Sequence, residues 1–186
     1  MKRIAVVLCV LFMLTGCAGT EQQLGRAMAL REKLLSASGC SFDAVVTADY
    51  GDVTYTFSMN CRGDDQGNLQ FAVVEPQTIA GISGTVSSTG GKLTFDDKAL
   101  TFGLMAEGLV TPVSAPWLFL KTLRSGYLTS CGKEGNYLRL SIDDSYEEDA
   151  LHLDIWLGEG DLPVQSDIYW QGCRLLSIQV ENFTFL

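Results

Sequence analysis

The chain has little of the chemistry on which most catalytic and metal sites depend. Its 186 residues include a single histidine, His152. No two cysteines beyond the N-terminal segment are close in sequence, so the ligand spacing typical of a zinc site is missing. No serine stands in a nucleophile elbow, and no glycine pattern typical of a phosphate-binding loop occurs. We therefore expect no enzyme activity, no metal and no cofactor.

Positive charge is also scarce. Lys and Arg number 13 against 22 Asp and Glu, which gives a formal net charge of −9 at pH 7. Such a surface repels phosphate backbones and anionic lipid head groups. Nucleic acid is therefore not an expected partner, and contact with a membrane would not come from a polybasic patch.

Long apolar runs are confined to the N-terminus. Lys2 and Arg3 precede an apolar segment from Ile4 to Leu14, which is shorter than the ~20 residues that a helix needs to cross a bilayer. A charged start, a short apolar segment and small residues after it are typical of a secretory signal. The remaining chain suits one domain, has no internal repeat and no low-complexity tract, and contains enough residues to bury one core.

The signal ends in Leu14-Thr15-Gly16-Cys17, which resembles the lipobox of bacterial lipoproteins. In that family the cysteine becomes the first residue and carries a diacylglyceryl thioether. The resemblance implies that residues 1–16 are removed, that Cys17 is a lipid anchor, and that 17–186 form a domain on a short tether in the cell envelope, outside the cytoplasm. The alternative is an ordinary signal peptide with a cysteine near its end.

The mature chain begins with one predicted helix, from Thr20 to Ser38. Leu24, Met28, Arg31 and Leu35 recur at helical spacing with Ala27 and Leu34 beside them, which predicts an amphipathic helix. A second helical stretch, from Pro116 to Leu123, carries large apolar side chains on more than one face.

Short alternating stretches fill the rest of the chain. The clearest runs from Val53 to Cys61, where apolar and polar side chains take turns as in a sheet with one wet face. Turn residues such as Gly51-Asp52 and Gly90-Gly91 separate the stretches and favour antiparallel hairpins. The predicted strands are Phe42–Asp49, Val53–Cys61, Leu69–Glu75, Ile79–Ser87, Lys92–Phe95, Leu100–Leu104, Tyr127–Cys131, Tyr137–Ile142, Leu151–Leu157, Leu162–Trp170 and Arg174–Phe185.

These elements predict an α+β fold that is mainly β. About ten or eleven strands are too many for a flat sheet and favour a strongly curved antiparallel sheet, an incomplete barrel. The N-terminal helix and the mid-chain helix are expected to cover its concave face.

The order of elements resembles the LolA-like superfamily of bacterial envelope proteins, which includes the periplasmic lipoprotein carrier and its outer-membrane receptor. The matching features are Glu75-Pro76 at a strand end, the segment Ile79–Ile82, the hairpin Gly90–Asp96, the helix Pro116–Leu123, and a closing pair with Pro163 and Arg174–Phe183. The resemblance implies an apolar concave face that leaves a cavity for acyl chains between sheet and helices.

We expect this cavity to be lined by apolar side chains of the sheet, with others at its mouth near loops and helix ends. The alternative is that each is ordinary core packing, because alternation demands apolar residues on any buried sheet face. The expected lining residues are Tyr55, Phe57, Met59, Phe71, Leu93, Phe95, Leu153 and Ile155, with Met105, Trp117, Leu118 and Phe119 at the mouth.

Two functions follow from these expectations. The first is a membrane-anchored, monomeric protein that binds or carries a hydrophobic ligand, a lipid or the acyl chain of a lipoprotein. The second is a non-enzymatic envelope sensor or protein-interaction module with the same fold. A deep accessible cavity favours carriage, whereas a filled interior with an apolar surface patch favours docking of a partner.

The cysteines predict disulfide bonds, because four remain after the anchor in an oxidising compartment. Folding the hairpin about Gly51 brings Cys40 nearly opposite Cys61, and Cys131 and Cys173 would then pair by default. The alternative is four free thiols.

Two polar features remain. His152 alternates with apolar neighbours and shares a strand face with Asp154, which indicates a solvated strand position rather than a general base. The acidic segment Asp143–Asp149 could offer oxygens to calcium, but it lacks the spaced ligands and turn glycine of a known loop. A solvated hairpin tip is the expected structure.

Overall fold

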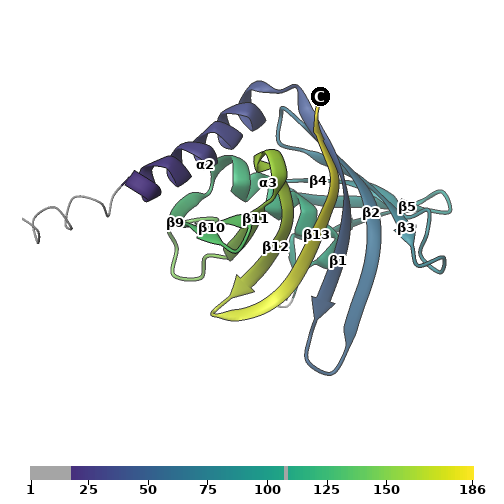
Figure 1. Cartoon of the computed structure of the whole chain (residues 1–186). Helices are drawn as coiled ribbons and strands as arrows, with labels where there is room; N and C mark the ends of the chain where they lie inside the picture. The colour runs from purple at the N-terminus through teal and green to yellow at the C-terminus, as the bar shows by residue number, and fades with distance from the viewer. Residues whose placement is uncertain (1–17, 107–108) are drawn as a thin grey trace, which may run out of the picture.

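The computed structural model describes residues 18–106 and 109–186, so the predicted signal, 1–16, and the predicted anchor Cys17 lie outside the described residues. Strands dominate the described part of the chain, which also contains two α-helices and two short 3₁₀ helices (Figure 1). In chain order the elements are α2 (Ala18–Ser36), β1 (Gly39–Asp49), β2 (Thr54–Asp64), β3 (Leu69–Glu75), β4 (Ser83–Ser87), β5 (Gly90–Phe95), β6 (Lys98–Phe102), β7 (Met105–Ala106), β8 (Leu109–Val110), η1 (Pro112–Ser114), α3 (Ala115–Ser125), β9 (Tyr127–Glu134), β10 (Tyr137–Asp143), β11 (His152–Leu157), η2 (Glu159–Asp161), β12 (Pro163–Trp170) and β13 (Cys173–Phe185).

One antiparallel sheet of 11 strands organises the molecule, in the order β6-β5-β4-β3-β2-β1-β13-β12-β11-β10-β9. Consecutive strands are neighbours throughout, apart from the junction that pairs β1 with the last strand, β13. The sheet is strongly curved and unclosed, as Figure 1 shows, and this confirms the predicted fold class. The two-stranded β7-β8 hairpin forms a separate small sheet.

The alternating pattern of the strands decides which side chains enter the core. In β1 the even-numbered residues from Cys40 to Ala48 are buried, and in β11 Leu153, Ile155 and Leu157 are fully buried. These residues face the concave side of the sheet, where α3 also lies. The hydrophobic core therefore sits between the inner face of the curved sheet and α3.

The N-terminal helix is buried along one side. Ala27, Leu30 and Leu34 are buried, whereas Leu24, Met28 and Leu35 are 45%, 49% and 58% exposed. The helix packs against β9, α3 and η2 rather than into the concave face, and Arg26 forms an ion pair with Asp161 of η2. Both sides of the helix carry apolar residues at helical spacing, so the neighbouring elements decide which side is buried.

The predicted Cys40–Cys61 disulfide bond is not present in the structure. Residue Cys40 stands opposite Gly63, and Cys61 stands opposite Phe42, so the two cysteines are diagonal neighbours on one face. Diagonal neighbours are roughly 7–8 Å apart, beyond the usual reach of a disulfide bond.

The other predicted pair is prevented by the order of the strands. Cys131 belongs to β9 and Cys173 to β13, and three strands of the sheet lie between them. All four cysteines are free thiols in the structure.

We expect the reactivity of these thiols to follow their burial. Burial raises the pKa of Cys40 to about 11 and also raises the pKa of Cys61, so both thiols should be inert in the folded protein. The exposed Cys173 should react rapidly with Ellman's reagent at pH 8, and the Cys173→Ser variant should lose this fast phase. Detection of fewer than four reactive thiols among these positions after unfolding without reductant would contradict the free-thiol structure.

Candidate functional site

The space inside the curved sheet is filled by the protein's own side chains. Of the predicted cavity residues, eight are buried in the core: Phe57, Met59, Phe71, Trp117, Leu118, Phe119, Leu153 and Ile155. Phe119 is fully buried and its ring meets Phe42 edge-on at a centroid distance of 5.7 Å. A Cβ atom on Gly63 would come within 2.3 Å of Leu120 Cδ2, so α3 lies directly against β2.

The other predicted residues lie at the outer end of the concave face. Tyr55 and Phe95 are 56% and 40% exposed, and Leu93 is half-buried. They point to the same side as the exposed Leu100 of β6, where the sheet extends beyond α3. The side chain of Met105 lies outside the described residues.

Apolar side chains instead form a surface trough along the two helices. Three adjoining hollows of about 590, 250 and 330 Å³ make up this helix-side trough. Leu35 belongs to the first two hollows, and Trp117 and Lys121 belong to the second and third. Its principal residues are Met28, Ala29, Arg31 and Leu35 of α2, Trp117, Leu118, Leu120, Lys121 and Arg124 of α3, Gln66 and Gly67 of the β2–β3 turn, Leu104, and Ala150 and Leu151 before β11.

Hydrogen bonds fix the floor of the helix-side trough. The guanidinium group of Arg31 donates to the carbonyl oxygens of Leu123 and Gly126, each at 3.0 Å, and its burial lowers the pKa of this arginine. Trp117 Nε1 donates to the carbonyl oxygen of Gly67 at 2.8 Å. These three bonds satisfy carbonyl groups at a helix end or a turn, so the two helices and the turn are held in one arrangement.

Further polar contacts surround the trough without giving it one sign of charge. Arg124 donates to the carbonyl oxygens of Asp64 and Asp65 at 2.8 and 3.0 Å. Lys121 lies 3.3 Å from an Asp144 carboxylate oxygen and 6.0 Å from the centre of the Trp117 ring. The surface is thus an apolar strip flanked by charged groups of both signs.

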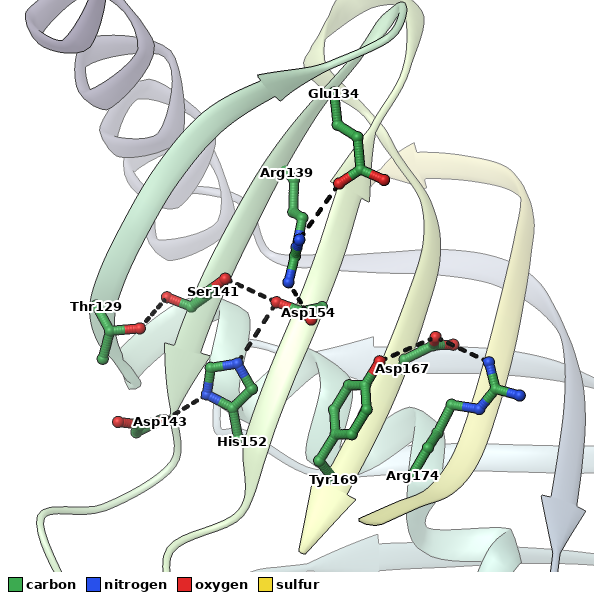
Figure 2. A network of polar contacts seen from close by, with 10 residues as sticks. All are labelled: Thr129, Glu134, Arg139, Ser141, Asp143, His152, Asp154, Asp167, Tyr169 and Arg174. Atoms are coloured by element: carbon green, nitrogen blue, oxygen red, sulfur yellow. Dashed lines mark hydrogen bonds and ion pairs between the residues drawn. The ribbon is translucent and has the colours of Figure 1, made fainter. Parts of the chain in front are cut away.

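The outer, convex face of the sheet carries a polar network that connects several strands (Figure 2). Arg139 Nη2 donates to Asp154 Oδ2 at 2.6 Å, and Ser141 Oγ donates to Asp154 Oδ1 at 2.7 Å. His152 Nδ1 lies 2.7 Å from Asp143 Oδ1, and its Nε2 lies 3.5 Å from Asp154 Oδ1. The sequence placed His152 and Asp154 on one face, as observed, but missed the partners, which come from β10.

A second buried carboxylate stands beside this group. Asp167 is directly opposite Asp154 across β11 and β12, and each residue is only 4% exposed. Arg174 Nη1 donates to Asp167 Oδ2 at 3.3 Å, and the Tyr169 hydroxyl donates to the same oxygen at 3.5 Å. Its other oxygen, Oδ1, is buried with no hydrogen-bond partner among the described residues. Each carboxylate therefore has its own arginine, which offsets the cost of burying it.

Ionisation of Asp154 depends on the balance of these contacts. Burial opposes the charged form, but hydrogen bonds from Arg139 and Ser141 outweigh it and hold the pKa of Asp154 below its usual value. The network thus stabilises the folded protein at pH values above the ordinary pKa of an aspartate side chain.

The acidic segment between β10 and β11 forms part of a hydrogen-bonded loop. Asp144 Oδ1 accepts the backbone N–H of Leu151 at 2.8 Å, and Tyr146 is 82% exposed. Within the described ranges, no three His, Cys, Asp or Glu side chains are grouped so that they could hold a metal ion. None of the helices in these ranges combines the length and apolar character that crossing a bilayer requires.

The fold and its surfaces define a class of protein: an unclosed, strongly curved antiparallel sheet filled by one helix. No family model and no curated protein matches the sequence. Solved structures that it is similar to include a LolA superfamily protein from Nitrosomonas europaea, with 8% identity and a TM-score of 0.47 over 86% of this chain and 93% of that chain.

Two further solved structures are similar at the same level. The lipoprotein LppX from Mycobacterium tuberculosis has 9% identity and a TM-score of 0.43, over 87% of this chain and 93% of that chain. A chain from the complex of the CwlD amidase with the GerS lipoprotein of Clostridioides difficile has 9% identity and a TM-score of 0.43, over 86% and 93%.

Replacing Phe119 tests whether the interior is filled. We expect Phe119→Ala to lower the free energy of unfolding by about 3–5 kcal/mol, because it leaves a cavity under the sheet. Leu100→Ala, at a residue 61% exposed, should change it by less than about 0.5 kcal/mol. Urea unfolding followed by tryptophan fluorescence measures both values, and a near-neutral Phe119→Ala would show that the space is not tightly packed.

The pH dependence of stability tests the network around Asp154. The pKa of Asp154 is lowered in the folded protein. Its contribution to the free energy of unfolding is therefore fully present above the unfolded-state pKa of about 3.9, and it is lost as the pH falls through the lower pKa of the folded state. Arg139→Gln should be less stable than wild type at pH 7. The difference in free energy of unfolding between the two proteins should shrink as the pH is lowered and Asp154 becomes protonated in both. Urea unfolding from pH 7 to pH 2 measures this, with Lys98→Gln as a control at the opposite edge of the sheet. A difference that is constant across this range would contradict the assignment.

Proposed function

We propose that this protein is a lipid-anchored, extracytoplasmic, non-enzymatic interaction module that docks an apolar surface of a partner protein in the helix-side trough. The observation that carries the proposal is the filled interior beside an open apolar strip. Because α3 occupies the concave face, the open apolar strip beside the helices is the surface left for a hydrophobic partner.

The shape of the helix-side trough favours a protein over a lipid as the occupant. A site for a small hydrophobic molecule encloses most of its surface, whereas these three hollows are open on one side. An acyl chain lying in them would keep much of its surface in water. A partner protein supplies the second wall, and exposed apolar side chains such as Leu24, Met28 and Leu35 then leave water on both molecules.

The charged groups beside the apolar strip agree with this kind of partner. Arg31 and Arg124 each bind backbone carbonyl groups, and Lys121 is paired with Asp144, so these cations are held in place as part of the rim. The trough thus offers contact area and a mixed polar rim, which is the usual composition of a protein interface.

The position of α2 connects the trough to the proposed anchor. The helix begins at Ala18, the residue after Cys17, and its 19 residues extend about 28 Å. If Cys17 carries the lipid, the exposed Leu24 and Met28 lie within a few turns of the bilayer surface. The partner would then be a protein that is itself at the membrane or reaches close to it.

Site-specific photo-cross-linking in intact cells tests the proposal. A photoreactive residue at Leu24 or Leu35 should give one discrete protein adduct, and Met28→Glu should reduce that adduct at least tenfold, because a charge in the strip is left without water. The same residue at Leu100, which is equally exposed on the sheet edge, should give none. Cys17→Ser should release the protein from the membrane.

The results separate docking from carriage. An adduct at Leu100 but not at Leu24 would move the interface to the sheet edge and contradict the proposal. Lipid extracted from the purified protein by organic solvent, together with binding of a fluorescent fatty acid that Met28→Glu abolishes, would replace docking by ligand carriage.

A further inference from the structure

A second concave surface lies on the opposite, convex side of the sheet. It is a groove of about 440 Å³, within the size range of small-molecule sites. Figure 2 shows two of the residues at this place, Glu134 and its neighbour Arg139. The side chains that give this convex groove its chemistry are Glu134, Tyr137, Trp156, Gln165, Gln179 and Glu181.

The strand register explains why these residues meet. Trp156 of β11 is paired with Gln165 of β12, which is paired with Gln179 of β13. Directly opposed residues of an antiparallel sheet point to the same face, so an aromatic ring and two carboxamides form one row across three strands. Tyr137 and Glu134 come from the β9–β10 hairpin at one end of the row.

The buried network holds the aromatic part of the groove in place. Arg139 lies opposite Trp156, and its guanidinium carbon is 5.7 Å from the centre of the indole ring. The same guanidinium group is fixed by Asp154 at 2.6 Å and by Glu134 at 3.4 Å. Asp154 is almost fully buried and also accepts a hydrogen bond from Ser141. Trp156 is therefore backed by a rigid ion pair, which is typical support for a binding residue.

The lining chemistry excludes several classes of ligand. Its one neighbouring cation, Arg139, is already neutralised by two carboxylates, so an anion such as a phosphate finds no free charge. An acyl chain in the groove would remove water from the amide and carboxylate groups along the row without giving them hydrogen-bond partners, which is unfavourable. A cationic peptide would find only Glu181 unpaired among the residues that line the groove, since Glu134 binds Arg139.

What fits is a molecule with many hydroxyl groups and apolar C–H faces. We propose that the convex groove binds a short neutral oligosaccharide, with a sugar ring against Trp156 and its hydroxyl groups bonded to Gln165, Gln179 and Glu181. The negative face of an aromatic ring attracts the C–H edge of a sugar, and a carboxamide both donates to and accepts from hydroxyl groups. This binding is independent of partner docking in the helix-side trough.

Titration with soluble sugars tests this proposal. Purified protein is titrated with the tetrasaccharides chitotetraose and maltotetraose, and binding is followed by calorimetry and by tryptophan fluorescence. We expect saturable binding of at least one of them, a loss of affinity of tenfold or more in Trp156→Ala, and a similar loss in the double variant Gln165→Ala/Gln179→Ala.

The matched control is Tyr146→Ala, which removes an 82% exposed aromatic ring outside the groove and should leave the affinity unchanged. Trp156→Phe keeps a ring face at the same position and should retain more affinity than Trp156→Ala, provided that thermal unfolding shows both variants folded. The proposal is overturned if the wild-type protein binds neither sugar at millimolar concentration. It is also overturned if Trp156→Ala binds as the wild type does, or if a lysine-rich peptide binds and both sugars do not.

Discussion

The burial of α3 in the concave face of the sheet is the interaction on which the rest of the structure depends. Eleven twisted strands curve without closing, so the inner face would stand open to water unless something covers it. The helix meets this requirement with side chains on nearly all its faces, among them the fully buried Phe119. The consequence, in residues 18–106 and 109–186, is a half-barrel whose concave side is occupied by α3 and the core side chains.

The two outside surfaces differ because the sheet is curved around an apolar centre. On the helix side, residues such as Met28 and Leu35 remain exposed after the core is complete, so this side offers apolar contact area. On the convex side, the carboxylates of Asp154 and Asp167 are buried among arginines and hydroxyl groups, which makes that face rigid and polar. The two surfaces therefore differ in chemistry and share no lining residue.

Much of the fold could be predicted because strand alternation is a local signal. The stretch from Val53 to Cys61 and the turn at Gly51 correctly gave the first hairpin, and Pro116 correctly marked the start of the mid-chain helix. The predicted strand Ile79–Ser87 begins later, at Ser83, because Gly81 adopts a positive φ of 88° in a turn. The alternation could not decide how segments far apart in the chain pack against each other. The side of α2 that is buried and the close approach of α3 to β2 are examples.

The sequence by itself determined the mainly β composition, the curved antiparallel architecture, the acidic surface and the apolar character of Trp117, Leu118 and Phe119, because each depends on periodicity or composition within a short stretch. Only the tertiary structure decided whether those apolar residues line a cavity or fill it, since that depends on how closely α3 approaches β2. It alone also brought Trp156, Gln165 and Gln179 into one row. Their meeting depends on the register of three strands, and register arises from the pairing of the whole sheet.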